Sequence, residues 1–187
     1  FSTTLPVENI NRAKNRIRAL SERDELTSLY NMRAFARLAE AEHDAANRGG
    51  RNYSILMVDI EHLKVINDTY GHEAGSRAVT LVAEALLRLR RSSDVVARYG
   101  GDKFIVLLSG ADKEVAEEVA QRVRNVVFST TLEVDVKMVR IKANVGAASY
   151  PESGNNLQAV VAGAARGVYK EKDPRGPRKG KLIIQKR

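Results

Sequence analysis

The chain contains no cysteine, which excludes disulfides, thiolate metal sites and cysteine nucleophiles. It has no apolar run near the ~20 residues that a transmembrane helix needs, and no signal peptide is visible. The Gly-x-x-x-x-Gly-Lys-Ser/Thr loop of P-loop proteins and the Gly-x-Gly-x-x-Gly turn of dinucleotide folds are both missing. The three histidines, His43, His62 and His72, are spaced badly for zinc. Because cysteine, a membrane span and a signal peptide are all missing, we expect a cytoplasmic protein, or the cytoplasmic part of a longer protein with or without a membrane anchor.

Aromatic residues make up only 5% of the chain and tryptophan is absent, so stacking platforms for single-stranded nucleic acid are poorly supported. The 187 residues carry a net charge of +8. Residues 170–187 hold eight basic and two acidic residues, a net charge of +6. This segment is either a solvated tail or an anion site. The composition favours small phosphate ligands over a nucleic acid polymer.

The N-terminal stretch is expected to be helical. Apolar residues recur at heptad spacing there, namely Ile10, Ala13, Ile17 and Leu20. Two alternatives are open: a single amphipathic helix packed on its own domain, or a dimerising linker that carries a signal from an upstream sensory domain. Because the chain starts at Phe1, we expect a fragment of a longer protein. We divide it into a signalling helix, residues 1–22, and one domain, residues 23–187.

The rest of the chain alternates between strand and helix patterns. Asn31 can cap a helix that ends before a loop at 46–51. Strands are expected at 53–60, 134–149 and 182–184, with a hairpin around Gly100 and Gly101. Helices are expected at 61–70, after Gly71, at 111–127 with Val115, Val119, Val123 and Val126 on one face, and at 157–172. This order predicts an α+β fold, with helices covering an antiparallel or mixed sheet.

Two predicted strand ends carry carboxylates. Asp59 and Glu61 end the first strand, and Asp102 lies at the tip of the hairpin. Lys64 follows about one helical turn after Glu61. Magnesium with phosphate substrates usually needs only one or two carboxylates, so the two strand ends could share a divalent metal.

Residues 98–104, Arg-Tyr-Gly-Gly-Asp-Lys-Phe, resemble the signature of the GGDEF domain, the diguanylate cyclase family. The segments 23–35, 59–75, 144–151 and 169–172 resemble further motifs of that family in the same order. Such an ordered set is far more specific than any one motif.

The resemblance implies a cyclase-palm, ferredoxin-like fold. It also implies a homodimer in which two GTP molecules, held with Mg²⁺ or Mn²⁺, condense to cyclic di-GMP by in-line phosphoryl transfer. Metal would be bound by Asp59, Asp102 and the Ile60 carbonyl, and phosphates by Lys64 and Lys172. The substrate site would comprise Asn67, which reads guanine, with Ser76, Asp68, Leu63, His72, Gly100, Gly101 and Lys103.

Residues 91–94, Arg-Ser-Ser-Asp, resemble the Arg-x-x-Asp motif that binds cyclic di-GMP away from the active site. Arg91 and Asp94 would pair with guanine there, and Arg122 is a further candidate. The alternative is an ordinary helix-to-strand turn.

Two departures from the family pattern concern the chemistry. Lys103 stands where the signature has an acidic residue, and a cation there would repel magnesium or contact phosphate itself. Ser76 stands where an aspartate helps to read guanine, and a hydroxyl can both donate and accept. Serine at this position resembles the variant group that makes cyclic GMP-AMP.

Two functions follow. The first is a cyclase with relaxed base choice that makes cyclic di-GMP from GTP, cyclic GMP-AMP from GTP and ATP, or both; the retained carboxylates Asp59 and Asp102 favour it. The second is a catalytically degenerate domain that binds GTP or cyclic di-GMP and passes on a signal; Lys103 favours it.

Overall fold

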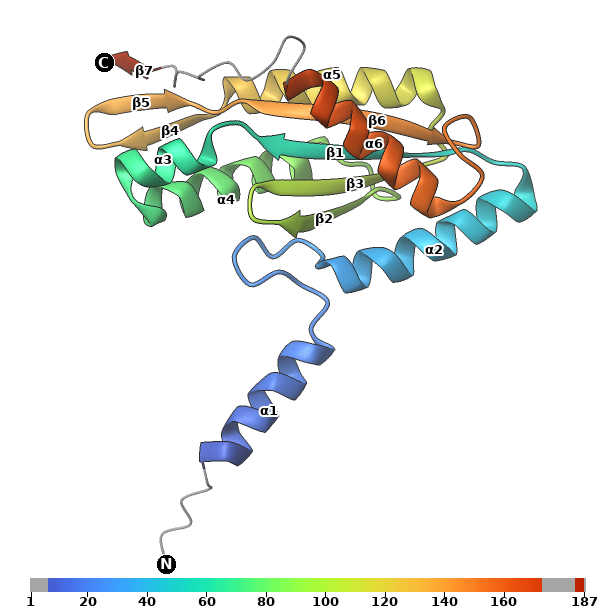
Figure 1. The fold of residues 1–187 in the computed structure, drawn as a ribbon, viewed down its shortest axis with the longest axis horizontal. Coiled ribbons are helices and arrows are strands. Elements are labelled where there is room, and N and C mark those ends of the chain that lie inside the picture. The colour runs from blue at the N-terminus through green and yellow to red at the C-terminus, as the bar shows by residue number, and fades with distance from the viewer. Residues whose placement is uncertain (1–6, 173–183, 187) are drawn as a thin grey trace, which may run out of the picture.

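Strand β1 (Tyr53–Ile60) is buried along its whole length and lies inside a four-stranded sheet. The computed structural model describes residues 7–172 and 184–186. The sheet has the order β2-β3-β1-β6, and each neighbouring pair is antiparallel (Figure 1). The other strands of this sheet are β2 (Val95–Gly100), β3 (Lys103–Ser109) and β6 (Ala143–Tyr150). The predicted α+β class and the predicted hairpin are confirmed.

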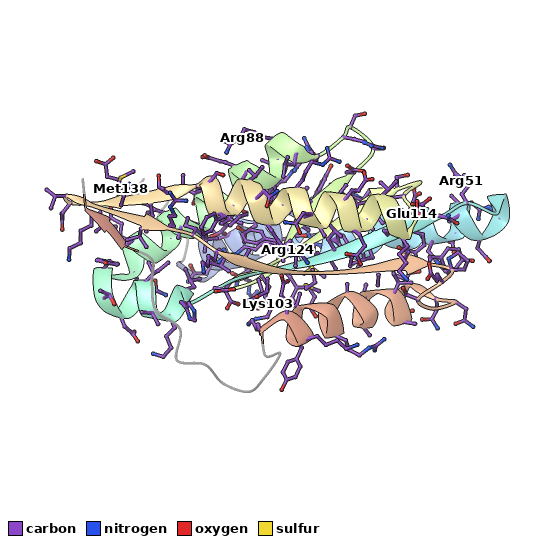
Figure 2. The ribbon with its side chains drawn as sticks, turned by 90° about the horizontal axis from the view of Figure 1, so that it is seen from above. Arg51, Arg88, Lys103, Glu114, Arg124 and Met138 are labelled. Carbon is purple, nitrogen blue, oxygen red and sulfur yellow. The ribbon has the colours of Figure 1, made fainter. Side chains whose placement is uncertain are left out.

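Helices cover both faces of the sheet because successive residues of β1 point to opposite sides. Leu56 and Val58 pack with the buried faces of α4 and α5, whereas Ile55 and Met57 pack with those of α2 and α6. Figure 2 shows α5 and α6 on opposite faces of β6. The helices are α1 (Val7–Leu20), α2 (Met32–Gly49), α3 (Leu63–Tyr70), α4 (His72–Leu89), α5 (Lys113–Ser129) and α6 (Leu157–Lys172).

Capping residues set several helix ends. The Asn31 side chain accepts a hydrogen bond from the Ala34 N–H at 3.0 Å, which confirms the predicted start of α2. This helix continues through most of the predicted loop at 46–51 and ends at Gly49, with Gly50 as its C-cap in the left-handed region at φ 60°. The predicted loop is therefore wrong in its first residues, where Ala46 is buried against the core.

The predicted single strand at 134–149 is wrong. The structure has three strands here: β4 (Thr131–Val134), β5 (Lys137–Arg140) and β6. Asp135, at φ 54°, and the exposed Val136 form the tip of a β4–β5 hairpin. Apolar residues alternate on both sides of this short turn, so the pattern alone reads as one long strand. A final strand, β7 (Ile184–Lys186), pairs with β5, and the predicted strand residues 182–183 lie outside the described part.

The buried face of α5 also differs from the prediction. Three of the four predicted valines are only partly buried, at the flanks of the contact: Val115, Val119 and Val126. The fully buried face consists of Ala116, Ala120, Val123 and Val127. Small alanine side chains let the helix backbone approach the sheet closely, and the larger valines fill the sides.

Helix α1 projects away from the rest of the fold (Figure 1). Ile10 and Ile17 are 43% and 67% exposed, which does not fit the first of the two alternatives, a helix packed on its own domain. None of the helices between residues 7 and 172 is both long enough and apolar enough to cross a membrane.

Candidate functional site

The end of β1 lies directly beside the turn between β2 and β3. Asp59 is the register partner of Lys103 across β1 and β3, and the Ile60 N–H donates to the Asp102 carbonyl at 2.9 Å. The two carboxylate-bearing strand ends therefore lie next to each other, as the sequence predicted.

Two lysine ammonium groups lie against this pair of carboxylates. Lys103 Nζ is 2.9 Å from Asp102 Oδ1 and 3.3 Å from Asp59 Oδ2. Lys172 Nζ, from the end of α6, is 2.8 Å from the same Asp59 oxygen. The hydrogen bond to Asp102 and the nearby Asp59 charge raise the pKa of Lys103 against the opposing effect of partial burial. Lys103 is therefore charged at neutral pH.

The residues present do not form a site for divalent cations while Lys103 is in place. The Asp59 side chain is 1% exposed, and its Oδ1 is buried without a hydrogen-bond partner, a feature that favours a cation. Two carboxylates and two ammonium groups, however, already balance in charge. A divalent ion between Asp59 and Asp102 would have to displace the Lys103 ammonium.

A hollow of about 180 Å³ opens beside the hairpin turn. Five of the predicted substrate residues line it: Leu63, Asn67, His72, Ser76 and Gly101. Asn67 Oδ1 is buried next to Gly75 without a hydrogen-bond partner, which leaves an unpaired acceptor at the edge of the hollow. The hollow therefore combines an amide and a hydroxyl with apolar walls, which suits a purine base.

The other predicted substrate and phosphate residues do not line this hollow. Lys64 is exposed on α3, where its ammonium group pairs with Asp68 at 2.8 Å rather than with the strand-end carboxylates. Gly100 ends β2 and is exposed. Of the two predicted phosphate lysines, Lys172 is therefore the one that lies at the carboxylate pair.

Sequence reasoning missed how the hairpin is held. Arg98 donates to the Gly101 carbonyl at 2.9 Å, and its Nη1 lies 3.3 Å from Asp24 Oδ2. Burial alone would raise the pKa of Asp24, but hydrogen bonds from Thr27 and the Arg98 charge outweigh it and lower that pKa. Leu26, from the same N-terminal loop, lines the hollow. The signal was present, since both ends of this contact lie in segments that resemble family motifs.

A second missed contact fixes the end of α6. Glu171 accepts a hydrogen bond from Arg124 Nε at 2.7 Å and another from the Val145 N–H. Arg124 also donates to the Val145 carbonyl at 2.6 Å. This clamp joins α5, β6 and α6 next to Lys172, so it helps to place the Lys172 ammonium on Asp59.

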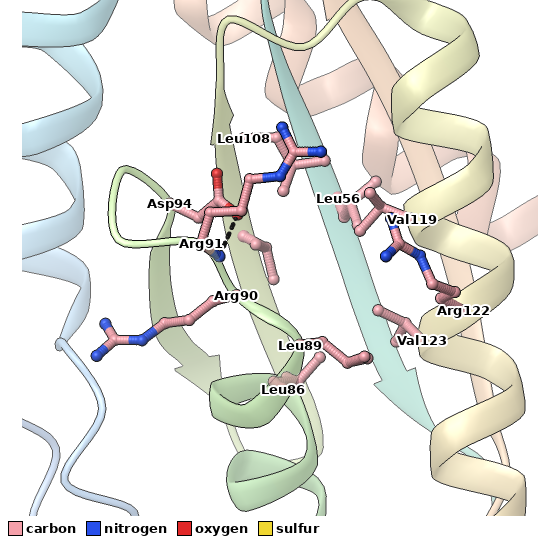
Figure 3. A pocket seen from close by; sticks show the side chains of 11 residues that line it. Leu56, Leu86, Leu89, Arg90, Arg91, Asp94, Leu108, Val119, Arg122 and Val123 are labelled. Carbon is pink, nitrogen blue, oxygen red and sulfur yellow. Dashed lines mark hydrogen bonds between the residues drawn. The ribbon is translucent and has the colours of Figure 1, made fainter.

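The Arg-x-x-Asp segment borders a separate cavity of about 90 Å³ between α4, the sheet and α5 (Figure 3). Arg91, Asp94 and Arg122 all line it, so the structure brings the three predicted residues together. The buried Asp94 carboxylate accepts from the Arg91 N–H at 2.8 Å and so holds the turn. The guanidinium group of Arg90 points away from the cavity (Figure 3).

The antiparallel sheet, with helices on both faces and a carboxylate-bearing hairpin at one strand end, defines a cyclase-palm domain. The family profile described as "Diguanylate cyclase, GGDEF domain" matches residues 21–177. The chain therefore belongs to the GGDEF domain family.

Individual relatives and solved structures agree with this family assignment. The probable diguanylate cyclase DgcC of Escherichia coli K12 is 33% identical over 159 residues, which cover 85% of this chain and 43% of that protein. This chain thus spans less than half the length of that relative. Diguanylate cyclase SiaD of Pseudomonas aeruginosa, solved with its activator SiaC, has a TM-score of 0.78 at 27% identity, covering 90% of this chain and 69% of that one. The coiled coil and GGDEF domain of DgcB from Caulobacter crescentus, solved with c-di-GMP, has a TM-score of 0.76 at 26% identity, covering 92% of both chains.

Proposed function

We propose that this chain is a GGDEF domain that binds a guanine nucleotide and cyclic di-GMP for signalling and does not condense nucleotides. One observation carries the proposal: the Lys103 ammonium bonds to both carboxylates that the family signature assigns to metal. Phosphoryl transfer in this family depends on metal ions that position the phosphates and offset the developing charge. The Lys103 ammonium group can bind a phosphate at these carboxylates, but it leaves less room there for the metal ions.

The hollow beside the hairpin supports nucleotide binding. Asn67 and Ser76 offer the polar contacts for the edge of a base, and Leu63 lies on the apolar wall. Lys172 and Lys103 lie at the strand-end carboxylates next to the same hairpin turn, and we assign them to the phosphates of a nucleotide bound in the hollow. The ligand is therefore a purine nucleoside triphosphate, with GTP as the first candidate.

A second candidate function is the cyclase itself. The Lys172–Asp59 contact and the retention of Asp102 favour it, because three of the predicted catalytic groups stay together. In this case a homodimer with Mg²⁺ or Mn²⁺ makes cyclic di-GMP, or cyclic GMP-AMP because Ser76 tolerates adenine as well as guanine.

Product analysis by mass spectrometry separates the two functions. The protein, fused to a dimerising coiled coil so that dimer formation does not limit the reaction, is incubated with Mg²⁺ and GTP, ATP or both. We expect no cyclic dinucleotide from the native sequence and cyclic di-GMP from Lys103→Glu. Lys113→Glu, the same reversal of charge at an exposed ion pair with Glu152, is the matched control and should stay inactive. Product from the native sequence would establish the cyclase, and cyclic GMP-AMP from the mixture would establish relaxed base choice.

The cavity at Arg91 gives a separate prediction for cyclic di-GMP. Arg91→Ala should weaken cyclic di-GMP binding by about tenfold or more, because a charged donor to the ligand is lost. Calorimetric titration measures this. Arg90→Ala is the matched control, since Arg90 also borders the cavity but points its guanidinium group away (Figure 3). GTP affinity should be unchanged in both variants, and equal loss of cyclic di-GMP binding in both would refute the assignment.

A further inference from the structure

We infer that the Lys103 ammonium replaces a divalent cation at the strand-end carboxylates, so that this domain binds its nucleotide without metal. The inference rests on the proposed function, because it concerns the same nucleotide site. It departs from the metal site that the family resemblance implies.

The strand register places Lys103 beside both strand-end carboxylates. Lys103 and Asp59 are directly opposite across antiparallel strands, where side chains on one face are neighbours. Asp102 precedes Lys103 at the turn, and its carboxylate lies 2.9 Å from the ammonium group. The cation is therefore held by the register of the sheet on one side and by the hairpin turn on the other.

The charges leave little attraction for a further cation. Asp59 and Asp102 contribute two negative charges, and Lys103 and Lys172 contribute two positive charges in direct contact with them. Asp59 Oδ2 already faces both ammonium groups, and Oδ1 is buried. A divalent ion would have to move Lys103 aside and then remain close to its charge, which is unfavourable.

Both ammonium groups stay accessible to a ligand. The side chains of Lys103 and Lys172 are 42% and 41% exposed, whereas the Asp59 side chain between them is 1% exposed. Each ammonium group has three donors, so it can bond to a carboxylate and a phosphate oxygen together. The structure therefore presents two cations, rather than two carboxylates, to an incoming triphosphate.

Two binding measurements test the inference. The first is the affinity for a fluorescent GTP analogue in EDTA and in Mg²⁺, and the second is Mn²⁺ binding followed by electron paramagnetic resonance. We expect the native chain to bind the analogue equally in both buffers and to bind no Mn²⁺. Lys103→Glu should bind Mn²⁺ and should lose about tenfold or more of its nucleotide affinity in EDTA, because a charge-assisted hydrogen bond is lost and a repulsive charge added.

The control variants keep the test decisive. Lys113→Glu should behave as the native chain does in both measurements. Lys103→Gln, which removes the charge without adding a carboxylate, serves if Lys103→Glu fails to fold, and it too should lose affinity in EDTA. Nucleotide binding by the native chain only in Mg²⁺, or Mn²⁺ binding equal to that of Lys103→Glu, would overturn the inference. Failure of the proposed function has a different signature, the release of cyclic dinucleotide by the native chain.

Discussion

Replacement of Gly146 by alanine should reduce the free energy of unfolding by about 3 kcal/mol or more, the upper range for overpacking a core. Gly146 lies in β6, where α6 crosses the sheet at very short range. A Cβ atom there would lie 2.0 Å from the Ala164 carbonyl oxygen and 2.5 Å from the Val168 nitrogen. Both are backbone atoms, so no side chain can move to relieve the clash and the whole helix must shift.

Urea unfolding measures this loss. Gly49→Ala is the matched control, because it makes the same chemical change where the nearest atom is an Arg51 side-chain atom at 3.4 Å. Equal stability of the two variants would contradict the close approach of α6 to β6. Any Gly146→Ala protein that still folds should also bind nucleotide more weakly, since α6 carries Lys172 to Asp59.

Gly75→Ala should weaken nucleotide binding by about tenfold or more while the domain remains folded. The added Cβ would lie 1.7 Å from Asn67 Oδ1 and 2.7 Å from Asn67 Cγ, so the amide must leave its place in the hollow. Alanine is favoured over glycine inside a helix by about 1 kcal/mol, and this preference in α4 offsets part of the strain. Titration with the fluorescent GTP analogue measures the effect.

A double-mutant cycle shows whether Gly75 acts through Asn67. Asn67→Ala alone should weaken binding to a similar extent. Adding Gly75→Ala to it should cause little further loss, because the amide that the methyl group displaces is already gone. Independent, additive losses in the double variant would mean that the methyl group blocks the ligand directly.

Elements with strong local signals could be predicted from the sequence. Strand β1 is a mostly apolar segment, Asn31 is a good N-cap, and Gly71 stops α3 at φ 89°. The β4–β5 hairpin was missed, because the apolar alternation continues past the turn and Asp135, which tolerates the left-handed region, is a weaker turn signal than glycine or proline. Local sequence patterns predict where single helices and strands lie better than they predict which strands pair.

The candidate site was predictable in part. The meeting of Asp59 and Asp102 follows from two strand ends and a hairpin. The Lys172–Asp59 contact joins residues 113 positions apart, so it follows from the family resemblance and the packing of α6, not from any local pattern. The sequence showed that Lys103 reverses a charge, but only its position opposite Asp59 shows that its ammonium group reaches both carboxylates.

The position of Lys103 in the β1–β3 register also has an evolutionary consequence. Lysine and glutamate codons differ at their first base alone, so a single nucleotide change in the gene would exchange the ammonium group between Asp59 and Asp102 for a carboxylate. The strands, the hollow and the clamp on α6 would need no other alteration. A lineage that carries this sequence is therefore one point mutation from an acidic centre, and selection could move it in either direction without rebuilding the fold.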